Sequence, residues 1–241
     1  MNEATLEQMH KLRLFGMQHS FKGMLESKSC QQFTIDQLLA TLVQAEWEEH
    51  ENRKINRLLK NAKFRYQASL EEIDYQHSRN LDKNQMLRFF DCNYVKMAEN
   101  ILITGATGLG KSHIMSALGH QACLMGYKVM YRNTQKLFNA LKLARVDGSY
   151  IRELKKIEKQ DLLILDDFGL HPLDSMACLT LMEIIEDRFA VKSIITGSQL
   201  PLEKWYEIIT EKSVADAVLD RLLNSSHKII LKGESMRRKK Y

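Results

Sequence analysis

The stretch ILITGATGLGKS, residues 101–112, decides the fold of this chain. Ile101–Thr104 is a short β-rich run, and Gly105–Ser112 fits the pattern G-x-x-x-x-G-K-[ST] at every specified position. The glycines let the backbone wrap around an anion with several N–H groups pointing inward. A helix that starts near Lys111 adds the positive end of its dipole. The stretch therefore predicts a strand, a phosphate-binding loop and a helix in succession.

The loop also predicts how a nucleotide is held. We expect Lys111 to reach the β- and γ-phosphates of ATP and the Ser112 hydroxyl to ligate Mg²⁺. Ile114, Met115 and Leu118 follow at helical spacing, which supports the strand–loop–helix context. The residues expected to line the nucleotide are Gly105, Ala106, Thr107, Gly108, Leu109, Gly110, Lys111, Ser112 and His113.

An acidic pair follows a second apolar run. Leu162–Leu165 is apolar at every position, as a central strand buried on both faces should be. Asp166 comes directly after it, where a carboxylate can hold the metal through water. Asp167 is placed to act as general base on the attacking water.

Strand-like and helical segments alternate in the C-terminal part, which predicts βαβ units and a five-stranded parallel sheet. The expected strands are Ile101–Thr104, Val129–Tyr131, Leu162–Leu165, Ser193–Thr196 and Lys228–Leu231. The chain up to about Asn93 reads as helical, with a capping box at Thr34 and Gln37. We therefore expect a small all-α domain over residues 1–95, for DNA or partner interaction, and an α/β ATPase domain over residues 96–241.

Basic residues gather in three stretches of a chain whose net charge is +5: residues 53–65, residues 132–159 and the segment after Lys228. Clustered basic charge is typical of a polyanion binder, although solvated helix faces give the same pattern. The candidate DNA contacts are Arg53, Arg57, Lys60, Lys142, Arg145, Arg152, Lys155 and Lys156.

Several classes of protein are disfavoured. The first residues do not resemble a secretory signal, and no stretch of about 20 apolar residues occurs, so we expect a cytoplasmic protein with no membrane partner. The four cysteines lie far apart without a C-x-x-C pair, and the eight histidines are scattered. A disulfide framework or a zinc site is therefore not expected.

Five motifs occur in a fixed order: the phosphate loop, LDDFG at 165–169, ITGSQLP at 195–201, AVLDRL at 217–222 and GESMR at 233–237. Together they resemble the IstB-like AAA+ ATPases, the transposition helper proteins of insertion sequences, which are related to the DnaC helicase loaders. The resemblance extends to residues 12–17 and 62–64 and so covers nearly the whole chain.

The resemblance implies further roles. Gln199, with Ser198 as second choice, is similar to the sensor-1 residue that orients the attacking water. Arg221 is similar to the arginine finger that completes a neighbouring subunit's site, and Arg237 to the sensor-2 arginine. A P-loop NTPase fold of the AAA+ type without a C-terminal helical lid is implied. The resemblance also implies ATP-dependent, head-to-tail homo-oligomers that bind duplex DNA largely independently of its sequence. These oligomers are expected to recruit or activate a cognate transposase.

Other functions stay open on the sequence alone. A DnaC-like helicase loader and a small-molecule P-loop kinase share the loop. A nucleotide-gated scaffold with little hydrolysis is a third alternative, because Asp167 is one methylene shorter than the usual Glu, which predicts slow turnover. For a transposition helper, we expect ATP hydrolysis that is slow and stimulated by DNA. Phe89, Phe90, Tyr94 and Val95 are candidates for the adenine site, but a role in the core is favoured.

Overall fold

The computed structural model describes residues 2–76 and 78–236 of the 241-residue chain. It divides into two compact units, Met1–Arg57 and Leu58–Tyr241, and helix α3 (Ile35–Ala62) contributes to both. The functional boundary expected near residue 95 falls inside the second unit and stays a prediction. No helix in the part of the chain that the structure describes is both long and apolar enough to span a bilayer.

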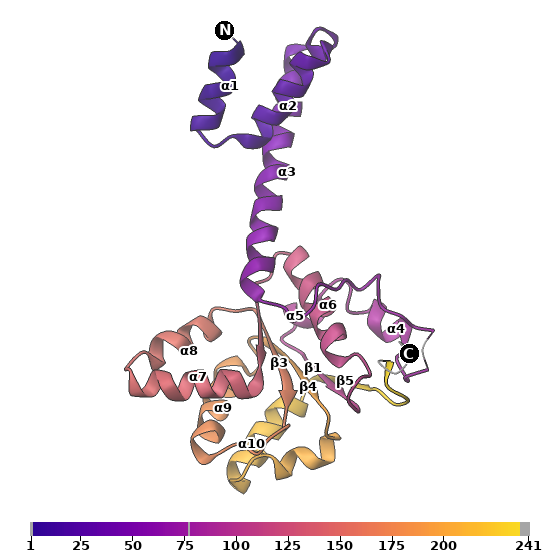
Figure 1. The fold of residues 1–241 in the computed structure, drawn as a ribbon, viewed down its shortest axis with the longest axis vertical. Helices are drawn as coiled ribbons and strands as arrows, with labels where there is room; N and C mark the ends of the chain where they lie inside the picture. The colour runs from indigo at the N-terminus through magenta and orange to yellow at the C-terminus, as the bar shows by residue number, and fades with distance from the viewer. Residues whose placement is uncertain (1, 77, 237–241) are drawn as a thin grey trace. The chain divides into compact units, whose positions relative to one another are not determined.

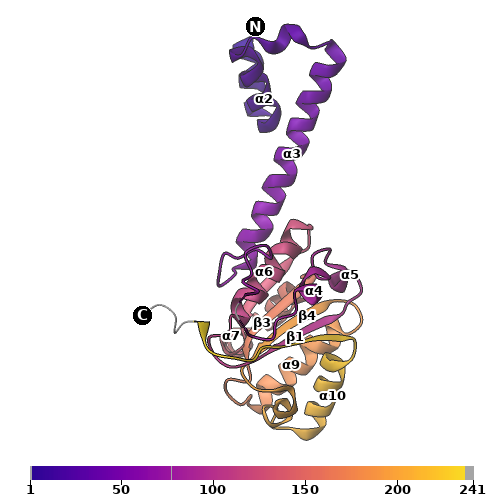
Figure 2. The same ribbon diagram turned by 90° about the vertical axis from the view of Figure 1, so that its right-hand side faces the viewer.

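The first unit is helical. It contains α1 (Asn2–Lys11), α2 (Phe15–Glu26), the short 3₁₀ helix η1 (Ser29–Gln32) and most of α3. The capping box opens α3 as expected: the Thr34 amide donates to Gln37 Oε1 at 3.0 Å, and the Gln37 amide to Thr34 Oγ1 at 3.3 Å. Helix α2 approaches α3 closely at Gly16, whose amide donates to Glu46 Oε2 at 2.8 Å. The two helices lie side by side in Figure 2.

The second unit is built on a five-stranded parallel sheet in the order β2-β3-β4-β1-β5. Figure 1 shows the sheet with helices around it. The strands are β1 (Asn100–Thr104), β2 (Val129–Asn133), β3 (Leu162–Phe168), β4 (Ser193–Ser198) and β5 (Ser226–Ile230). The helices are α4 (Lys83–Leu87), α5 (Asn93–Lys96), α6 (Lys111–Leu124), α7 (Thr134–Val146), α8 (Tyr150–Glu158), α9 (Ser175–Arg188), η2 (Leu202–Glu207) and α10 (Lys212–Leu223). The predicted α/β class and the five parallel strands are confirmed. Residues 231–236, the described part after β5, form no lid helix.

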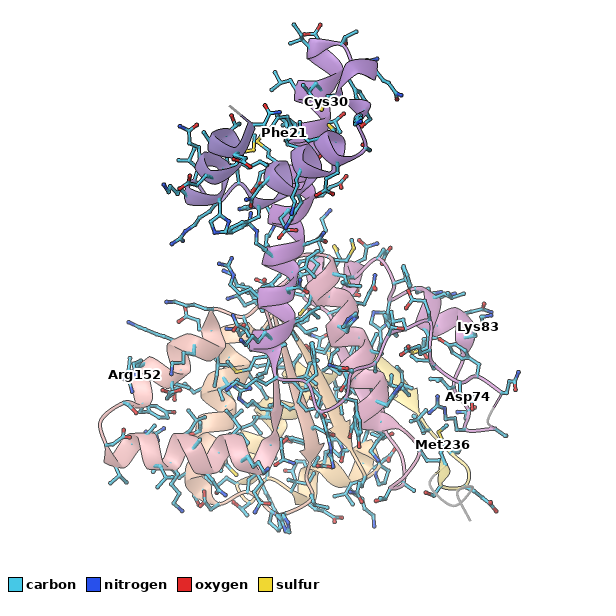
Figure 3. The ribbon with its side chains drawn as sticks, turned by 45° about the horizontal axis from the view of Figure 1, so that its top comes forward. Phe21, Cys30, Asp74, Lys83, Arg152 and Met236 are labelled. Atoms are coloured by element: carbon cyan, nitrogen blue, oxygen red, sulfur yellow. The ribbon has the colours of Figure 1, made fainter. Side chains whose placement is uncertain are left out.

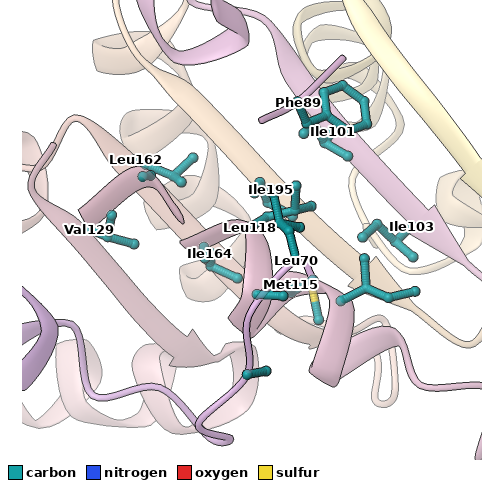
Figure 4. Packing of buried hydrophobic residues seen from close by; sticks show 14 of the residues in the cluster. Leu70, Phe89, Ile101, Ile103, Met115, Leu118, Val129, Leu162, Ile164 and Ile195 are labelled. Atoms are coloured by element: carbon teal, nitrogen blue, oxygen red, sulfur yellow. The ribbon is translucent and has the colours of Figure 1, made fainter. Parts of the chain in front are cut away.

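Each face of the sheet has its own apolar core. Along β3, Leu162 and Ile164 enter one core while Leu163 and Leu165 enter the other, so the strand is buried on both sides as its unbroken apolar run predicts. Figure 4 shows Met115 and Leu118 of α6 packed with Ile164 and other strand residues on the first face. Helices α7, α9 and α10 contribute the second core.

The first core also recruits the segment that precedes the sheet. Ala68, Leu70 and Ile73 are buried there, which places this part of the segment against the sheet. The described residues between α3 and α4 form no helix, so the helical reading up to Asn93 holds only in part. Tertiary packing of these apolar side chains overrides the local pattern.

The same core accounts for most of the adenine candidates. Phe89, Tyr94 and Val95 are buried in it, in agreement with the core interpretation, and Phe90 is exposed.

Candidate functional site

The phosphate loop joins β1 to α6 with a backbone that needs glycine. Gly105, Gly108 and Gly110 have φ of +150°, +89° and +84°, values that L side chains rarely adopt. The Lys111 ammonium donates to the carbonyl oxygens of Gly105 at 2.7 Å and Ala106 at 2.9 Å. The loop thus curls around its own lysine at the N-terminus of α6, the geometry that presents backbone N–H groups and a helix dipole to phosphates.

The acidic pair lies near the carboxyl end of β3. Because the strands are parallel, this is the same end of the sheet at which the phosphate loop follows β1. The pairing of β3 with β4 slips between Leu165 and Phe168, and Asp167 has φ +57°. Such an irregularity re-aims side chains at the end of a strand. Asp166 is 1% exposed, whereas Asp167 lines the open cavity.

Both carboxylates accept hydrogen bonds from residues far away in the sequence. Asp166 Oδ2 accepts from the Tyr131 hydroxyl and from Arg65 Nη1 at 3.3 Å. Asp167 Oδ2 accepts from Asn133 Nδ2 at 2.9 Å and from Arg65 Nη1 at 3.4 Å. Arg65 therefore bridges the proposed metal ligand and the proposed base.

Burial and charge set the protonation of these donors. Burial, followed by the hydrogen bond to Asp166 and its charge, raises the pKa of Tyr131 far above its usual range, so its hydroxyl keeps the proton and donates. Burial opposes the charge on Arg65, but Tyr66, Asp166 and Asp167 outweigh it and raise the pKa of Arg65. The guanidinium is therefore a permanent cation at the acidic pair.

A cavity of about 660 Å³ opens over the loop, within the usual size range of ligand pockets. Lys111, Ser112 and Asp167 line its sheet side. Its lining also includes Met236 of the last motif and residues outside the five motifs: Arg65, Tyr66, Glu72, Asp74, Arg79, His113 and Leu170. Figure 3 marks Asp74 and Met236, which come from the segment before β1 and from the end of the described chain.

Gln199 and Ser198 have different surroundings at the end of β4. Gln199 Oε1 accepts from the Thr107 hydroxyl at 2.7 Å, so Gln199 lies against the phosphate loop. Ser198 is fully buried, and its hydroxyl donates to the Phe168 carbonyl at 2.7 Å. The geometry favours Gln199 as the side chain available to a γ-phosphate.

Arg79 ties the segment before β1 to the loop. Its Nη1 donates to the Leu109 carbonyl at 2.9 Å and its Nη2 to the Asp74 carbonyl at 2.8 Å. The C-terminal segment joins them, because the Met236 amide donates to the Gly108 carbonyl at 3.1 Å. Arg237, the sensor-2 candidate, lies outside the described residues.

Arg221 lies at the opposite end of the sheet. Its carbonyl accepts from Asn100 Nδ2 at 3.4 Å, at the first residue of β1, whereas the phosphate loop follows the last. At about 3.3 Å per residue, the strand separates the two by roughly 13 Å. The guanidinium pairs with Glu186 Oε2 at 2.8 Å and lies 5.7 Å from the centre of the Phe189 ring. The structure therefore does not bring Arg221 to its own chain's cavity.

Some of the candidate DNA contacts already have a partner within the chain, and others do not. Arg53 pairs with Glu46 at 2.8 Å, and Arg145 stacks on the Tyr150 ring at 3.6 Å. Lys142, Arg152 and Lys156 also have acidic partners, although Figure 3 shows Arg152 reaching outward from α8. Arg57, Lys60 and Lys155 are exposed and have no ion pair or hydrogen bond within the described residues. Their contact with DNA stays a prediction.

The oxygen donors at the loop suit Mg²⁺. No group of three or more His, Cys, Asp or Glu side chains that could hold a metal occurs within residues 2–76 and 78–236. Mg²⁺ needs no such group, because it commonly binds one or two carboxylates together with substrate phosphates. The Ser112 hydroxyl and the Asp166 carboxylate fit that pattern.

The comparisons with known proteins agree with this geometry. The family model described as IstB-like ATP binding protein matches residues 7–241. A protein of Sinorhizobium fredii named as an insertion sequence ATP-binding protein is 39% identical over 234 residues, 97% of this chain and 96% of its own. The ATP-binding protein of insertion sequence IS1162 from Pseudomonas fluorescens is 38% identical over 202 residues, 83% of this chain and 87% of its own.

Two solved structures share the fold at lower identity. The crystal structure of DnaI matches with a TM-score of 0.58 and 19% identity, covering 74% of this chain and 92% of DnaI. The DnaC helicase loader matches with a TM-score of 0.55 and 21% identity, covering 68% of this chain and 97% of the loader. At these identities the likeness concerns the fold alone.

Proposed function

The chain belongs to the family of IstB-like ATP-binding proteins, and we propose that it is an ATP-dependent regulator of DNA transposition that assembles on duplex DNA and activates a transposase. ATP binding by an AAA+ domain is the family property. The DNA, the oligomer and the transposase are the parts that we propose.

The convergence of Lys111, Asp167 and Gln199 on one cavity carries the proposal of ATP hydrolysis. Lys111 would neutralise the β- and γ-phosphates, and Gln199 would orient the attacking water. Asp167 would accept the proton of that water. Mg²⁺, held by Ser112 and Asp166, would supply further charge neutralisation of the phosphates.

Turnover is proposed to be slow until DNA is bound. The Asp167 carboxylate is one methylene shorter than Glu, and Asn133 and Arg65 both donate to it. These two donors occupy lone pairs that the attacking water would otherwise use. An assembly that rearranges these donors would therefore raise the rate.

The position of Arg221 supports a shared site. An arginine at the amino end of β1 can reach a γ-phosphate only in another subunit, since its own loop lies at the other end of the strand. Subunits that each complete the next one's site associate head to tail, which gives closed rings or helical filaments.

The exposed basic side chains of Arg57, Lys60 and Lys155 support contact with the phosphates of duplex DNA. Such contacts carry no base-specific information, so binding would be largely independent of sequence. The relatives are named for insertion sequences, which supports a cognate transposase as the protein partner.

Phosphate release from ATP tests the proposal, measured without DNA, with duplex DNA and with single-stranded DNA. Duplex DNA should stimulate release severalfold, and Lys111→Ala, which removes the phosphate-binding charge, should abolish it in every condition. Stimulation by single-stranded DNA alone would point to a helicase loader instead. Transfer of phosphate to a small metabolite would point to a kinase.

A further inference from the structure

We propose that Arg65 and Mg²⁺ compete for the same oxygen of Asp166, so that Arg65 must leave the acidic pair when the metal is loaded. This inference rests on the proposed ATP site. It makes Arg65 a positioning residue that couples metal loading to the release of the proposed base, Asp167.

At Oδ2, the hydrogen bonds of Asp166 leave no room for both cations. Its Oδ1 accepts from the Asp167 amide at 2.9 Å. Its Oδ2 accepts from the Tyr131 hydroxyl and from Arg65 Nη1 at 3.3 Å. A carboxylate oxygen offers about two lone-pair sites, so Oδ2 has none left for a metal ion or for a metal-bound water. One of its two donors must move before Oδ2 can serve the metal.

Arg65 is the donor that can move. Tyr131 is 5% exposed and lies on β2. This strand pairs with β3, which carries the acidic pair. Its buried ring also packs against Phe64, which holds the hydroxyl in place. The side chain of Arg65, by contrast, is 45% exposed and lies in the non-helical stretch after α3. A partly exposed ion pair is weak enough to exchange.

The backbone next to Arg65 is anchored, so the movement belongs to the side chain. Phe64 packs edge-on against the Tyr131 ring with 6.2 Å between ring centroids. On the other side, Tyr66 lies 6.2 Å from His113 at the start of α6. A freed guanidinium therefore stays at the mouth of the nucleotide cavity, which both Arg65 and Tyr66 line.

The departure of Arg65 would change both acids together. The same Nη1 that contacts Asp166 also lies 3.4 Å from Asp167 Oδ2. A doubly charged metal at Asp166 replaces the single charge of the guanidinium there, while Asp167 loses one of its two side-chain donors. A lone-pair position on Asp167 Oδ2 thus becomes free for a water molecule in the cavity when the metal has been loaded.

Metal affinity, measured apart from turnover, tests the inference. The protein is saturated with a non-hydrolysable ATP analogue, and Mn²⁺ binding is followed through the loss of the free Mn²⁺ signal in electron paramagnetic resonance. Arg65→Gln removes the competing charge and should bind Mn²⁺ about twofold to fivefold more tightly, the range of a partly exposed ion pair. The matched control is Lys63→Gln, which removes the same charge from an exposed side chain two residues away and should leave the affinity unchanged.

Further arms separate the possible failures. Arg65→Lys keeps the charge but loses the planar guanidinium, so its Mn²⁺ affinity should lie between those of the parent and Arg65→Gln. Equal or weaker Mn²⁺ binding by both Arg65 variants, folded as judged by thermal melting, would overturn the competition. Equal tightening by Lys63→Gln would also overturn it, since general charge would then be the cause. Binding of the ATP analogue to the parent in EDTA is scored separately, and its failure would count against the proposed function.

Discussion

Asp167 shows how a single residue is prepared for its proposed role. Its left-handed backbone and the slipped strand pairing before Phe168 direct the carboxylate to the cavity, while its neighbour Asp166 is buried. Two adjacent acids thus have different surroundings, which is how one can hold a metal while the other handles a proton.

The first prediction separates binding from hydrolysis. Asp167→Asn should bind ATP almost as tightly as the parent but release phosphate about 10²–10⁴-fold more slowly, because only the proton acceptor is lost. The measurements are nucleotide affinity and phosphate release on the same preparations. Hydrolysis by Asp167→Asn at the parental rate would show that another group acts as the base.

Motif spacing could identify Lys111, Ser112, Asp166 and Asp167, because each is fixed by its neighbours in the sequence. The same reasoning could not find the donors that surround them. Arg65 is 101 residues from Asp166, and Tyr131 is 35 residues from it. Arg65 belonged to a basic stretch that the sequence analysis connected with DNA, and no local pattern distinguishes it from its basic neighbours there.

Among the elements, the strands were the most predictable part. Buried parallel strands show as apolar runs, and all five were located with their ends within three residues of those observed. The largest difference is at β3, which continues three residues beyond the expected end, to Phe168. The structure of the stretch between α3 and α4 was not predicted correctly. Ala68, Leu70 and Ile73 are buried by contact with the sheet core, and no local hydrophobic period in the sequence indicates this.

The second prediction concerns the close approach of α2 to α3. A Cβ on Gly16 would lie 2.2 Å from the Ala45 carbonyl oxygen, so Gly16→Ala should destabilise the first unit by about 1–3 kcal/mol. Gly23, on the same helix, meets nothing within 4 Å, and Gly23→Ala should stabilise it by about 0.5–1 kcal/mol. Hydrogen exchange of α2 and α3 peptides in the full chain, followed by mass spectrometry, measures both. Equal protection in the two variants would refute the proposed close packing.

At the scale of the whole molecule, the third prediction concerns DNA. Affinity for duplex DNA should fall steeply with salt, since Lys and Arg displace condensed counterions, and any preference should favour easily bent sequences. Arg57→Gln, Lys60→Gln and Lys155→Gln should each lower the slope of log K against log salt by about 0.9 if the residue contacts a phosphate. Lys11→Gln is the control, because Lys11 pairs with Glu7 at 2.7 Å and is outside the proposed contacts. A flat salt response of the parent would contradict the electrostatic account.

The central claim is that ATP is hydrolysed at a site shared between subunits, with Arg221 serving the neighbour's loop. Its own loop is out of reach at the other end of β1, and within the chain the guanidinium pairs with Glu186 at 2.8 Å. On this proposal ATP would be a ligand of the assembled state and would favour assembly by mass action.

The most direct test mixes Arg221→Ala with Lys111→Ala on duplex DNA and measures phosphate release. Each variant alone should be inactive, because every interface lacks either the finger or the lysine. In the mixture some interfaces pair an intact loop with an intact Arg221, so about a quarter of randomly formed interfaces should be competent and activity should reappear. A mixture that co-assembles on DNA and stays inactive would contradict the account.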